Sequence, residues 1–309
     1  MPGPAATAAF ETATFDADER FQRYLGTILF APFAGAFFDQ VMLPEVAAGV
    51  EWTGRIRNSP FERGLRSAAA DQLAFLGTPQ DNRALGEWLR QAHRDVKGVG
   101  FNGVRFSALN PESWNWIMTS AIVALQNAFT PITGEVLSDI ERQELYEVLL
   151  EKFEHTQLPG RHSRLPATYR DLLDWYDSVL AAKGQHNKAV ANAVDTLRHP
   201  PLPPFLPGFV RPMWRPIGEL VGHLAIVCSF GIMHPAARAL TGYTWTRRHE
   251  LELRVISAIL PQIYQRFPRR LTMTPMAYHR WRYLQLAQRY WSMQLDSFAP
   301  PCLHARRDA

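Results

Sequence analysis

Apolar residues recur along most of this chain at the spacing of an α-helix. Within residues 83–96, Leu85, Leu89 and Ala92 follow one another at intervals of four and three positions, which places them on one helical face. Comparable patterns cover residues 61–76, 110–128, 138–154, 168–182, 248–266 and a last helix that begins at 275. The sequence contains no convincing series of strands and no internal repeat. The pattern predicts an all-α fold, built as a single large helical domain.

The ends of the predicted helices carry local signals. Asn110 and Pro111 supply an N-cap followed by a proline at the first helical position. The segment 138–141, Ser-Asp-Ile-Glu, is a capping box that opens another helix. Three glycines interrupt the pattern between residues 98 and 103, and a short extended piece is expected after them. Residues 199–216 contain too many prolines for a regular helix, so we predict a strap packed over the body.

Two apolar stretches approach the length of a membrane span. The first runs from Gly26 to Val50 and contains two prolines and Asp39. The second runs from Ile217 to Met233 and contains Glu219 and His223. Charged residues are rare in membrane-spanning helices. We therefore predict two buried helical segments and no transmembrane span, with membrane contact limited to the periphery.

Composition narrows the class of protein. Of the 309 residues, 47% are hydrophobic and 20% are charged, and the net charge is +4 with the basic residues scattered. We expect no nucleic-acid partner. The two cysteines and the absence of a signal-peptide pattern fit a cytoplasmic protein. We predict a disordered segment over residues 1–15, the helical domain over 16–298 and a flexible tail over 299–309; the sequence leaves the oligomeric state open.

His93 is the most informative candidate ligand. It lies four residues after Leu89 and three before Val96, on or beside the apolar face of its helix. Such a histidine is most often a core residue with one hydrogen bond, and no second ligand completes a metal motif nearby. A haem, however, supplies four nitrogens itself and needs only one axial imidazole from the protein. The spacing alone leaves both interpretations open.

Three short motifs, taken in order, resemble those of the rubber oxygenase (latex-clearing protein) and MpaB-type oxygenase family. They are an R-x-x-x-S/T helix, a helix that ends in H-x-x-V-x-G, and an aromatic-x-A-x-N/D-P segment that leads to a tryptophan. Here they comprise residues 63–67, 93–98 and 106–116. The resemblance runs from about Phe33 to about Pro268, and it implies a haem-binding helical domain.

The resemblance also implies roles for individual residues. His93 would be the axial ligand of a haem b in a buried pocket, and Arg63, Arg66 and Ser67 would lie on the other side of the haem. Rubber-cleaving members carry a lysine where this chain has Arg66, and an arginine stays protonated and cannot donate an electron pair to iron. The family therefore implies an open distal iron site for dioxygen and a lipophilic, unsaturated or isoprenoid-like substrate.

The chain departs from the family pattern at several positions, and these departures leave other functions open. Phe106 stands where a tyrosine is common, and Met118 replaces a histidine of the usual Trp-Val-His. Glu45 and Glu51 precede the first motif, and either is a candidate pocket base. The alternatives to an oxygenase are a non-catalytic helical binding or scaffold protein, and a haem sensor or carrier.

Overall fold

A computed structural model describes residues 19–54, 58–160 and 164–294 of the chain. Its elements are helices, apart from one two-stranded antiparallel sheet. The all-α fold predicted from the hydrophobic pattern is confirmed. The predicted disordered segment over 1–15 and the tail over 299–309 lie outside the described residues, as do both ends of the domain predicted over 16–298.

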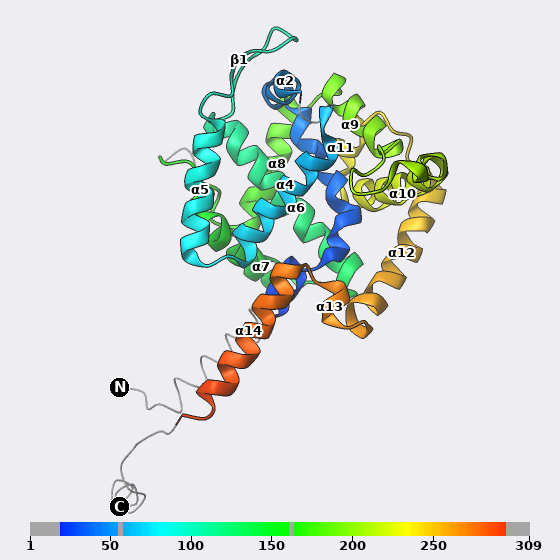
Figure 1. Cartoon of the computed structure of the whole chain (residues 1–309). Coiled ribbons are helices and arrows are strands. Elements are labelled where there is room, and N and C mark those ends of the chain that lie inside the picture. Colours follow the sequence, from blue (N-terminus) through cyan, green and yellow to red (C-terminus); the bar gives the residue numbers. More distant parts are fainter. Residues whose placement is uncertain (1–18, 55–57, 161–163, 295–309) are drawn as a thin grey trace, which may run out of the picture.

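Helix α6 (Pro111–Thr133) forms the centre of the fold (Figure 1). The side chain of its N-cap Asn110 accepts hydrogen bonds from the backbone N–H groups of Glu112 and Ser113, as predicted. Most of the helix is buried, because the 3₁₀ helix η1 (Ile28–Met42), α8 (Tyr169–Lys183) and α12 (Arg247–Arg266) pack around it. The predicted buried segment after residue 26 is thus η1 followed by α2 (Pro44–Thr53).

A polar cluster lies inside this core. The fully buried Trp116 of α6 stacks on Tyr176 of α8, with ring centroids 4.8 Å apart. The Tyr176 hydroxyl donates to Asp39 Oδ2 of η1 at 2.8 Å, and the Ser120 hydroxyl donates to Asp39 Oδ1. Burial raises the pKa of the Asp39 carboxyl to about 6, although both hydrogen bonds favour the charged form.

Helices α4 (Pro60–Leu76) and α5 (Pro79–His93) form a helical hairpin on one side of the molecule (Figure 1). Its turn is fixed by a capping box, in which Thr78 Oγ1 accepts from Asp81 N and the Asp81 carboxylate accepts from Thr78 N at 2.8 Å. After α5 the chain forms the strands β1 (Lys97–Val99) and β2 (Arg105–Ser107), which lie against α2.

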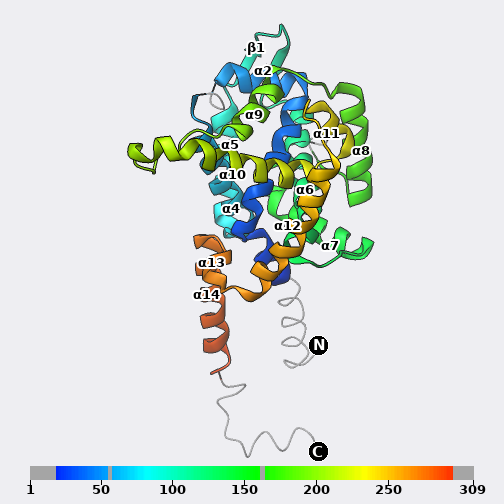
Figure 2. The same cartoon turned by 90° about the vertical axis from the view of Figure 1, so that its right-hand side faces the viewer.

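The other elements complete the body. They are α7 (Asp139–Phe153), η2 (Glu154–Thr156), α9 (Lys188–Arg198), η4 (Gly208–Val210), α10 (Arg211–Ile232), α11 (Pro235–Leu240), α13 (Arg269–Thr272) and α14 (Pro275–Trp291). Figures 1 and 2 show α14 extending away from the body, and Figure 2 shows one end of α10 projecting beyond its neighbours.

The proline-rich segment differs from the prediction in two respects. Its last part, residues 211–216, is helical and forms the start of α10. Pro212 lies in the first turn, where the missing N–H has no helical partner to lose, and Pro216 removes only one further bond. The preceding part contacts α4 through the rings of Phe205 and Phe61, and Pro200 accepts from Trp214 Nε1 at 2.8 Å within the segment itself. It is packed more loosely than predicted, because Phe205 and Phe209 are 71% and 84% accessible.

Helix α10 is also less buried than the sequence predicts. Residues Gly208–Ile232 form a helical stretch long and apolar enough to cross a membrane, and 44% of its apolar window is buried. Gly218, Gly222 and Ile226 face the body, whereas Leu220 and Leu224 are exposed. The described residues therefore show one marginal apolar helix and no clear transmembrane span.

Candidate functional site

The position of His93 follows from the packing of α5. The inward face of this helix carries Leu85 and Gly86, and it packs against η2. A Cβ added at Gly86 would lie 1.9 Å from the backbone oxygen of His155 in η2, so glycine permits this close approach. Arg90 Nη1 also donates to the His155 carbonyl at 3.1 Å. His93 continues the same face at the last turn of α5 and is partly buried.

The hydrogen bond of His93 defines its tautomer. Nδ1 lies 2.8 Å from the carbonyl oxygen of Leu89, one helical turn earlier. A carbonyl only accepts, so Nδ1 carries the proton and Nε2 of the neutral ring carries the lone pair. The edge-on ring of Trp114 lies 5.5 Å from the His93 ring, centroid to centroid. A fixed Nδ1–H with a free lone pair on Nε2 is the arrangement that metal-binding histidines adopt.

The hairpin brings the three α4 candidates to the same end as His93. At about 1.5 Å per residue, Arg63 stands about 20 Å and His93 about 21 Å from the turn along their respective helices. Arg66 and Ser67 lie about one turn closer to it. Arg63 and His93 thus lie at similar distances from the turn along α4 and α5, whereas Arg66 and Ser67 lie nearer to it.

The burial of the α4 residues differs from what a haem pocket requires. Arg63 is partly buried, but Arg66 and Ser67 are exposed. Arg66 Nη2 pairs with Glu62 Oε2 at 3.2 Å on the surface. The opposite, apolar side of this half of α4 is exposed as well, with Leu65 57% accessible. The described residues, 19–54, 58–160 and 164–294, do not show the buried haem pocket expected from the sequence.

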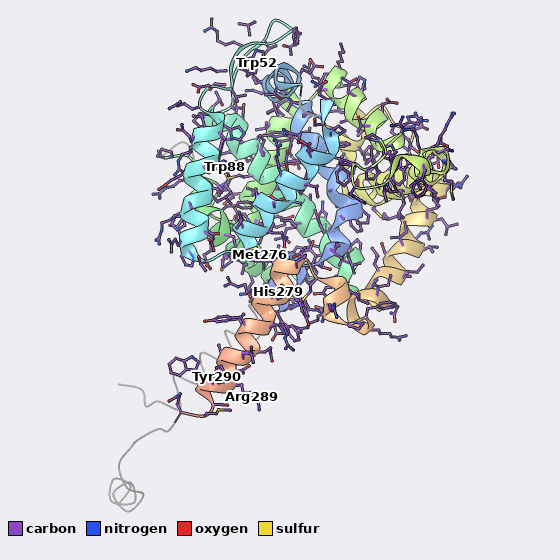
Figure 3. The ribbon with its side chains drawn as sticks, viewed as in Figure 1. Trp52, Trp88, Met276, His279, Arg289 and Tyr290 are labelled. Atoms are coloured by element: carbon purple, nitrogen blue, oxygen red, sulfur yellow. The ribbon has the colours of Figure 1, made fainter. Side chains whose placement is uncertain are left out.

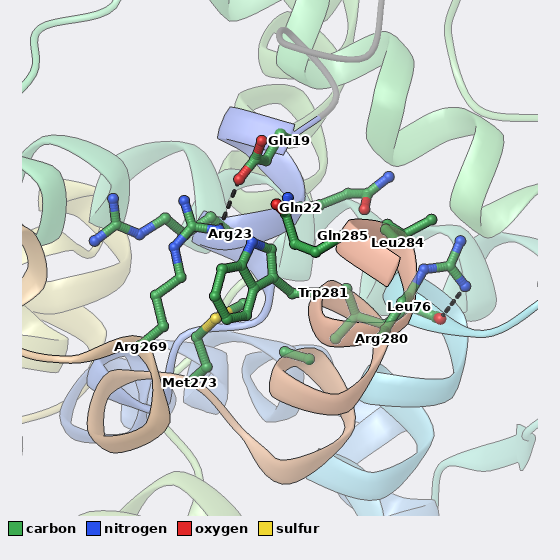
Figure 4. Close-up of a pocket in the computed structure, with 11 residues that line it drawn as sticks. Glu19, Gln22, Arg23, Leu76, Arg269, Met273, Arg280, Trp281, Leu284 and Gln285 are labelled. Carbon is green, nitrogen blue, oxygen red and sulfur yellow. Dashed lines mark hydrogen bonds and ion pairs between the residues drawn. The ribbon is translucent and has the colours of Figure 1, made fainter. Parts of the chain in front are cut away.

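The cavity drawn in Figure 4 is a different feature. It lies between the first described helical turns and α14, and its lining includes Arg23, Arg269 and Trp281. Arg269 Nη1 pairs with Glu19 Oε1 at 2.7 Å at its edge. Its volume of about 30 Å³ is far below the roughly 300–1,000 Å³ of small-molecule sites. We do not assign the haem or a substrate to it.

Both candidate bases lie on α2, which packs against the strands that follow His93. Glu45 is near Lys183, with Oε1 3.8 Å from Nζ. Glu51 Oε1 is buried and has no hydrogen-bond partner among the described residues, and the same holds for Glu45 Oε2. A buried carboxylate oxygen without a partner is costly for folding alone. Glu51 is the more isolated of the two, because no ion pair is found for it in the described part of the chain.

Large apolar side chains are exposed on α2, on α5 and between the two strands. Figure 3 labels Trp52 of α2 and Trp88 of α5, which are 48% and 55% accessible. Phe101, between β1 and β2, is 86% accessible. The three side chains come from α2, α5 and the turn between the strands, and each adds apolar surface to this side of the molecule.

Sequence reasoning missed the Leu89 acceptor, although its position four residues before His93 is a local signal that any helix offers. It also missed a second group of ligand-type side chains between α10 and α12. There the local signal is His249 and Glu252, three residues apart on one helical face, but their partner His223 is distant in the sequence.

Comparison with known proteins shows to which family the chain belongs. No curated protein and no solved structure matches the chain. A family model described as "ER-bound oxygenase mpaB/B'/Rubber oxygenase, catalytic domain" matches residues 5–262, which is most of the chain. The match contains all three sequence motifs. The chain therefore belongs to this family of ER-bound MpaB and rubber oxygenases, and it is an oxygenase.

Proposed function

We propose that this oxygenase is haem b-dependent and that His93 supplies the axial ligand through Nε2. The observation that carries the proposal is the 2.8 Å contact between Nδ1 and the Leu89 carbonyl, which fixes the ring and leaves the lone pair on Nε2. Bound at this position, a haem b would supply the iron chemistry that activates dioxygen. Family membership favours this function over a scaffold or a haem carrier.

The α4 residues would act from the opposite side of the group. Arg63 and Arg66 carry permanent positive charges, and Ser67 offers a hydroxyl on the same helical face. The guanidinium groups of the two arginines can donate charge-assisted hydrogen bonds to negative charge that develops beside them. Because Arg66 has no lone pair to offer to iron, we propose that the distal position is open.

We propose Glu51 as the proton acceptor for the substrate. Its Oε1 atom is buried without a hydrogen-bond partner among the described residues. Trp52 of α2, Trp88 of α5 and Phe101 between the strands are exposed and provide apolar surface. A lipophilic substrate, such as an unsaturated or isoprenoid-like hydrocarbon, matches this surface better than a charged one.

We also propose that the protein contacts a membrane of anionic phospholipid through α10. The exposed apolar residues of this helix recur at helical spacing and cover about 100° of its circumference; they are Met213, Ile217, Leu220, Val221 and Leu224. Arg211 and Arg215 are exposed at its projecting end, where they would attract anionic headgroups. The family description includes ER-bound oxygenases, which is consistent with such contact.

Haem content and the Soret band test the cofactor proposal. The purified chain should contain one non-covalent haem b, and His93→Ala should lose most of it. His199→Ala, which removes an exposed histidine elsewhere, is the matched control and should keep full haem content. Full occupancy in His93→Ala would remove this residue from the axial role. A protein that stays colourless after haem reconstitution would instead support the non-catalytic alternative.

Vesicle sedimentation tests the membrane proposal. The chain should co-sediment with phosphatidylcholine vesicles that contain phosphatidylserine, and Leu220→Glu should release it. Val136→Glu places the same charge at another exposed apolar position and should not change binding. Equal binding of the two variants would exclude α10 as the contact surface.

A further inference from the structure

Three ligand-type side chains meet between α10 and α12, on the side of the molecule opposite α5 (Figure 1). His223 comes from α10, and His249 and Glu252 come from the first turns of α12. One ligand atom of each lies within 4.8 Å of the other two. We propose that these residues bind a divalent transition-metal ion, with Zn²⁺ as the best match.

The fold explains why the three residues meet. His249 and Glu252 are three residues apart and therefore share one face of α12. The two helices pack against each other, and His223 is partly buried between them. The ring centroids of the two histidines are 5.8 Å apart. Both ends of the site are thus built on regular helices, which hold side chains more rigidly than loops do.

The ligand set has the chemistry of a known class of site. Two imidazole nitrogens and one carboxylate, with a further position left for water, are a frequent set for zinc. His223 Nε2 lies 2.8 Å from Glu252 Oε2. Ligands on a tetrahedral zinc ion with bonds of about 2.05 Å lie about 3.3 Å apart. An ion can therefore replace the proton between these two atoms after a side-chain movement of about half an ångström, and the proton is released to solvent.

His249 requires a change of tautomer. Its Nδ1 accepts from Thr246 N at 3.1 Å, and Nε2 lies 3.4 Å from the Tyr243 hydroxyl. Nδ1 also lies 3.0 Å from Thr246 Oγ1, and this oxygen can accept a proton carried by Nδ1. On metal binding through Nε2, the ring proton would reside on Nδ1, which would donate a hydrogen bond to Thr246 Oγ1 and give up the bond that it accepts from Thr246 N–H. Such an acceptor behind a ligating histidine orients the ring.

A neighbouring arginine orients the Glu252 carboxylate. Arg248 Nε donates to Glu252 Oε1 at 2.8 Å, which leaves Oε2 directed at His223. The guanidinium opposes a cation electrostatically, whereas the Glu252 carboxylate attracts it. The side chains of His223 and Glu252 are 36% and 27% accessible, so an ion and its water ligand can reach the site from solvent.

Metal analysis and calorimetry of the full-length protein test the proposal. After treatment with a chelator and dialysis, Zn²⁺ alone is titrated into the wild-type chain and into His223→Asn, His249→Gln and Glu252→Gln. His249→Gln is the most informative variant, because glutamine three residues after Thr246 preserves a capping box and hence the start of α12. We expect one Zn²⁺ per wild-type chain and at least a tenfold loss of affinity in each variant.

His199→Gln is the matched control. His199 Nδ1 pairs with Asp195 Oδ1 at 3.1 Å. Among the described residues this histidine–carboxylate pair has no second histidine beside it, so it resembles the proposed site in chemistry but lacks its third ligand. This variant should bind Zn²⁺ as the wild type does.

Zn²⁺ should also raise the melting temperature of the wild type but not of His249→Gln, because only a folded site binds it. Unchanged Zn²⁺ affinity in His249→Gln, or no binding by the wild type, would overturn the proposal. Haem iron should be unaffected throughout, so the outcome is independent of the His93 proposal.

Discussion

The buried Asp39 gives the wild-type protein a stability that falls as pH rises, and Asp39→Asn should remove this dependence. Burial raises the pKa of the Asp39 carboxyl to about 6 in the folded chain, whereas an unfolded aspartate titrates near 3.9. Between these values the folded state holds more protons than the unfolded state. Stability from this group is therefore present below the unfolded pKa and is lost as pH rises through the folded pKa.

The two pKa values set the magnitude. A difference of about two units corresponds to about 3 kcal/mol at full ionisation, of which about 2–2.5 kcal/mol develops between pH 4 and pH 8. Asparagine keeps the size of the side chain and can still accept from Ser120, but it does not titrate. The free energy of unfolding of Asp39→Asn, relative to wild type, should therefore rise by this amount over the same pH range.

Urea unfolding of both proteins at several pH values measures the effect. The difference between the two proteins cancels the titration of all other groups, such as Glu141, whose pKa is lowered to about 2 by hydrogen bonds from Ser138 and Arg20. Tyr176→Phe keeps the ring against Trp116 but removes a hydrogen bond that favours the charged form of Asp39, so it should raise the pKa of the Asp39 carboxyl further. In a Tyr176→Phe background, the stability difference between the chain with Asp39 and the chain with Asp39→Asn should therefore continue to grow at higher pH. A difference that stays constant from pH 4 to pH 8 would refute the reasoning.

Three further predictions concern α4, α5 and α2. Gly86→Ala should lower the melting temperature by several degrees, because its Cβ would lie 1.9 Å from the His155 oxygen and overpacking costs about 1–3 kcal/mol; Gly64→Ala, with no atom within 4 Å, should instead gain about 0.5–1 kcal/mol from helix propensity. A higher melting temperature for Gly86→Ala would show that η2 is not held against α5. Arg66→Lys should shift the ferric electron paramagnetic resonance spectrum toward low spin, while a purely low-spin wild type with two protein ligands would contradict the open distal position. Glu51→Gln should lower product formation from an unsaturated hydrocarbon at least tenfold without loss of haem, and unchanged turnover would exclude it as the base.

Helix positions were largely predictable because their signals are local. The capping boxes at Thr78 and Ser138 and the N-cap Asn110 act through hydrogen bonds between residues two or three apart, so the sequence contains both partners. The hydrophobic period likewise predicted that Leu85 and Leu89 would lie on the side of α5 that faces the body. The order of the three short motifs was sufficient to identify the family, and the match to the family model confirms this identification.

The surroundings of the candidate site were less predictable. The sequence indicated that His93 would lie on or beside an inward face, but not which side-chain rotamer it adopts, and the rotamer decides whether Nδ1 reaches the Leu89 carbonyl one turn earlier. The family resemblance implied that Arg63, Arg66 and Ser67 line a buried haem pocket, whereas the structure leaves Leu65, Arg66 and Ser67 exposed. Exposure depends on which other elements approach a helix, and no local pattern encodes that.

The sequence by itself determined the all-α class, the helices with their caps, and the membership of the oxygenase family, because each depends on neighbours along the chain or on short ordered motifs. Only the tertiary structure brought His223 of α10 to His249 and Glu252 of α12, and only it enclosed Asp39 between Ser120 and Tyr176. These groupings join residues far apart in the chain, and their distances are set by helix packing, which sums many weak contacts over the whole core.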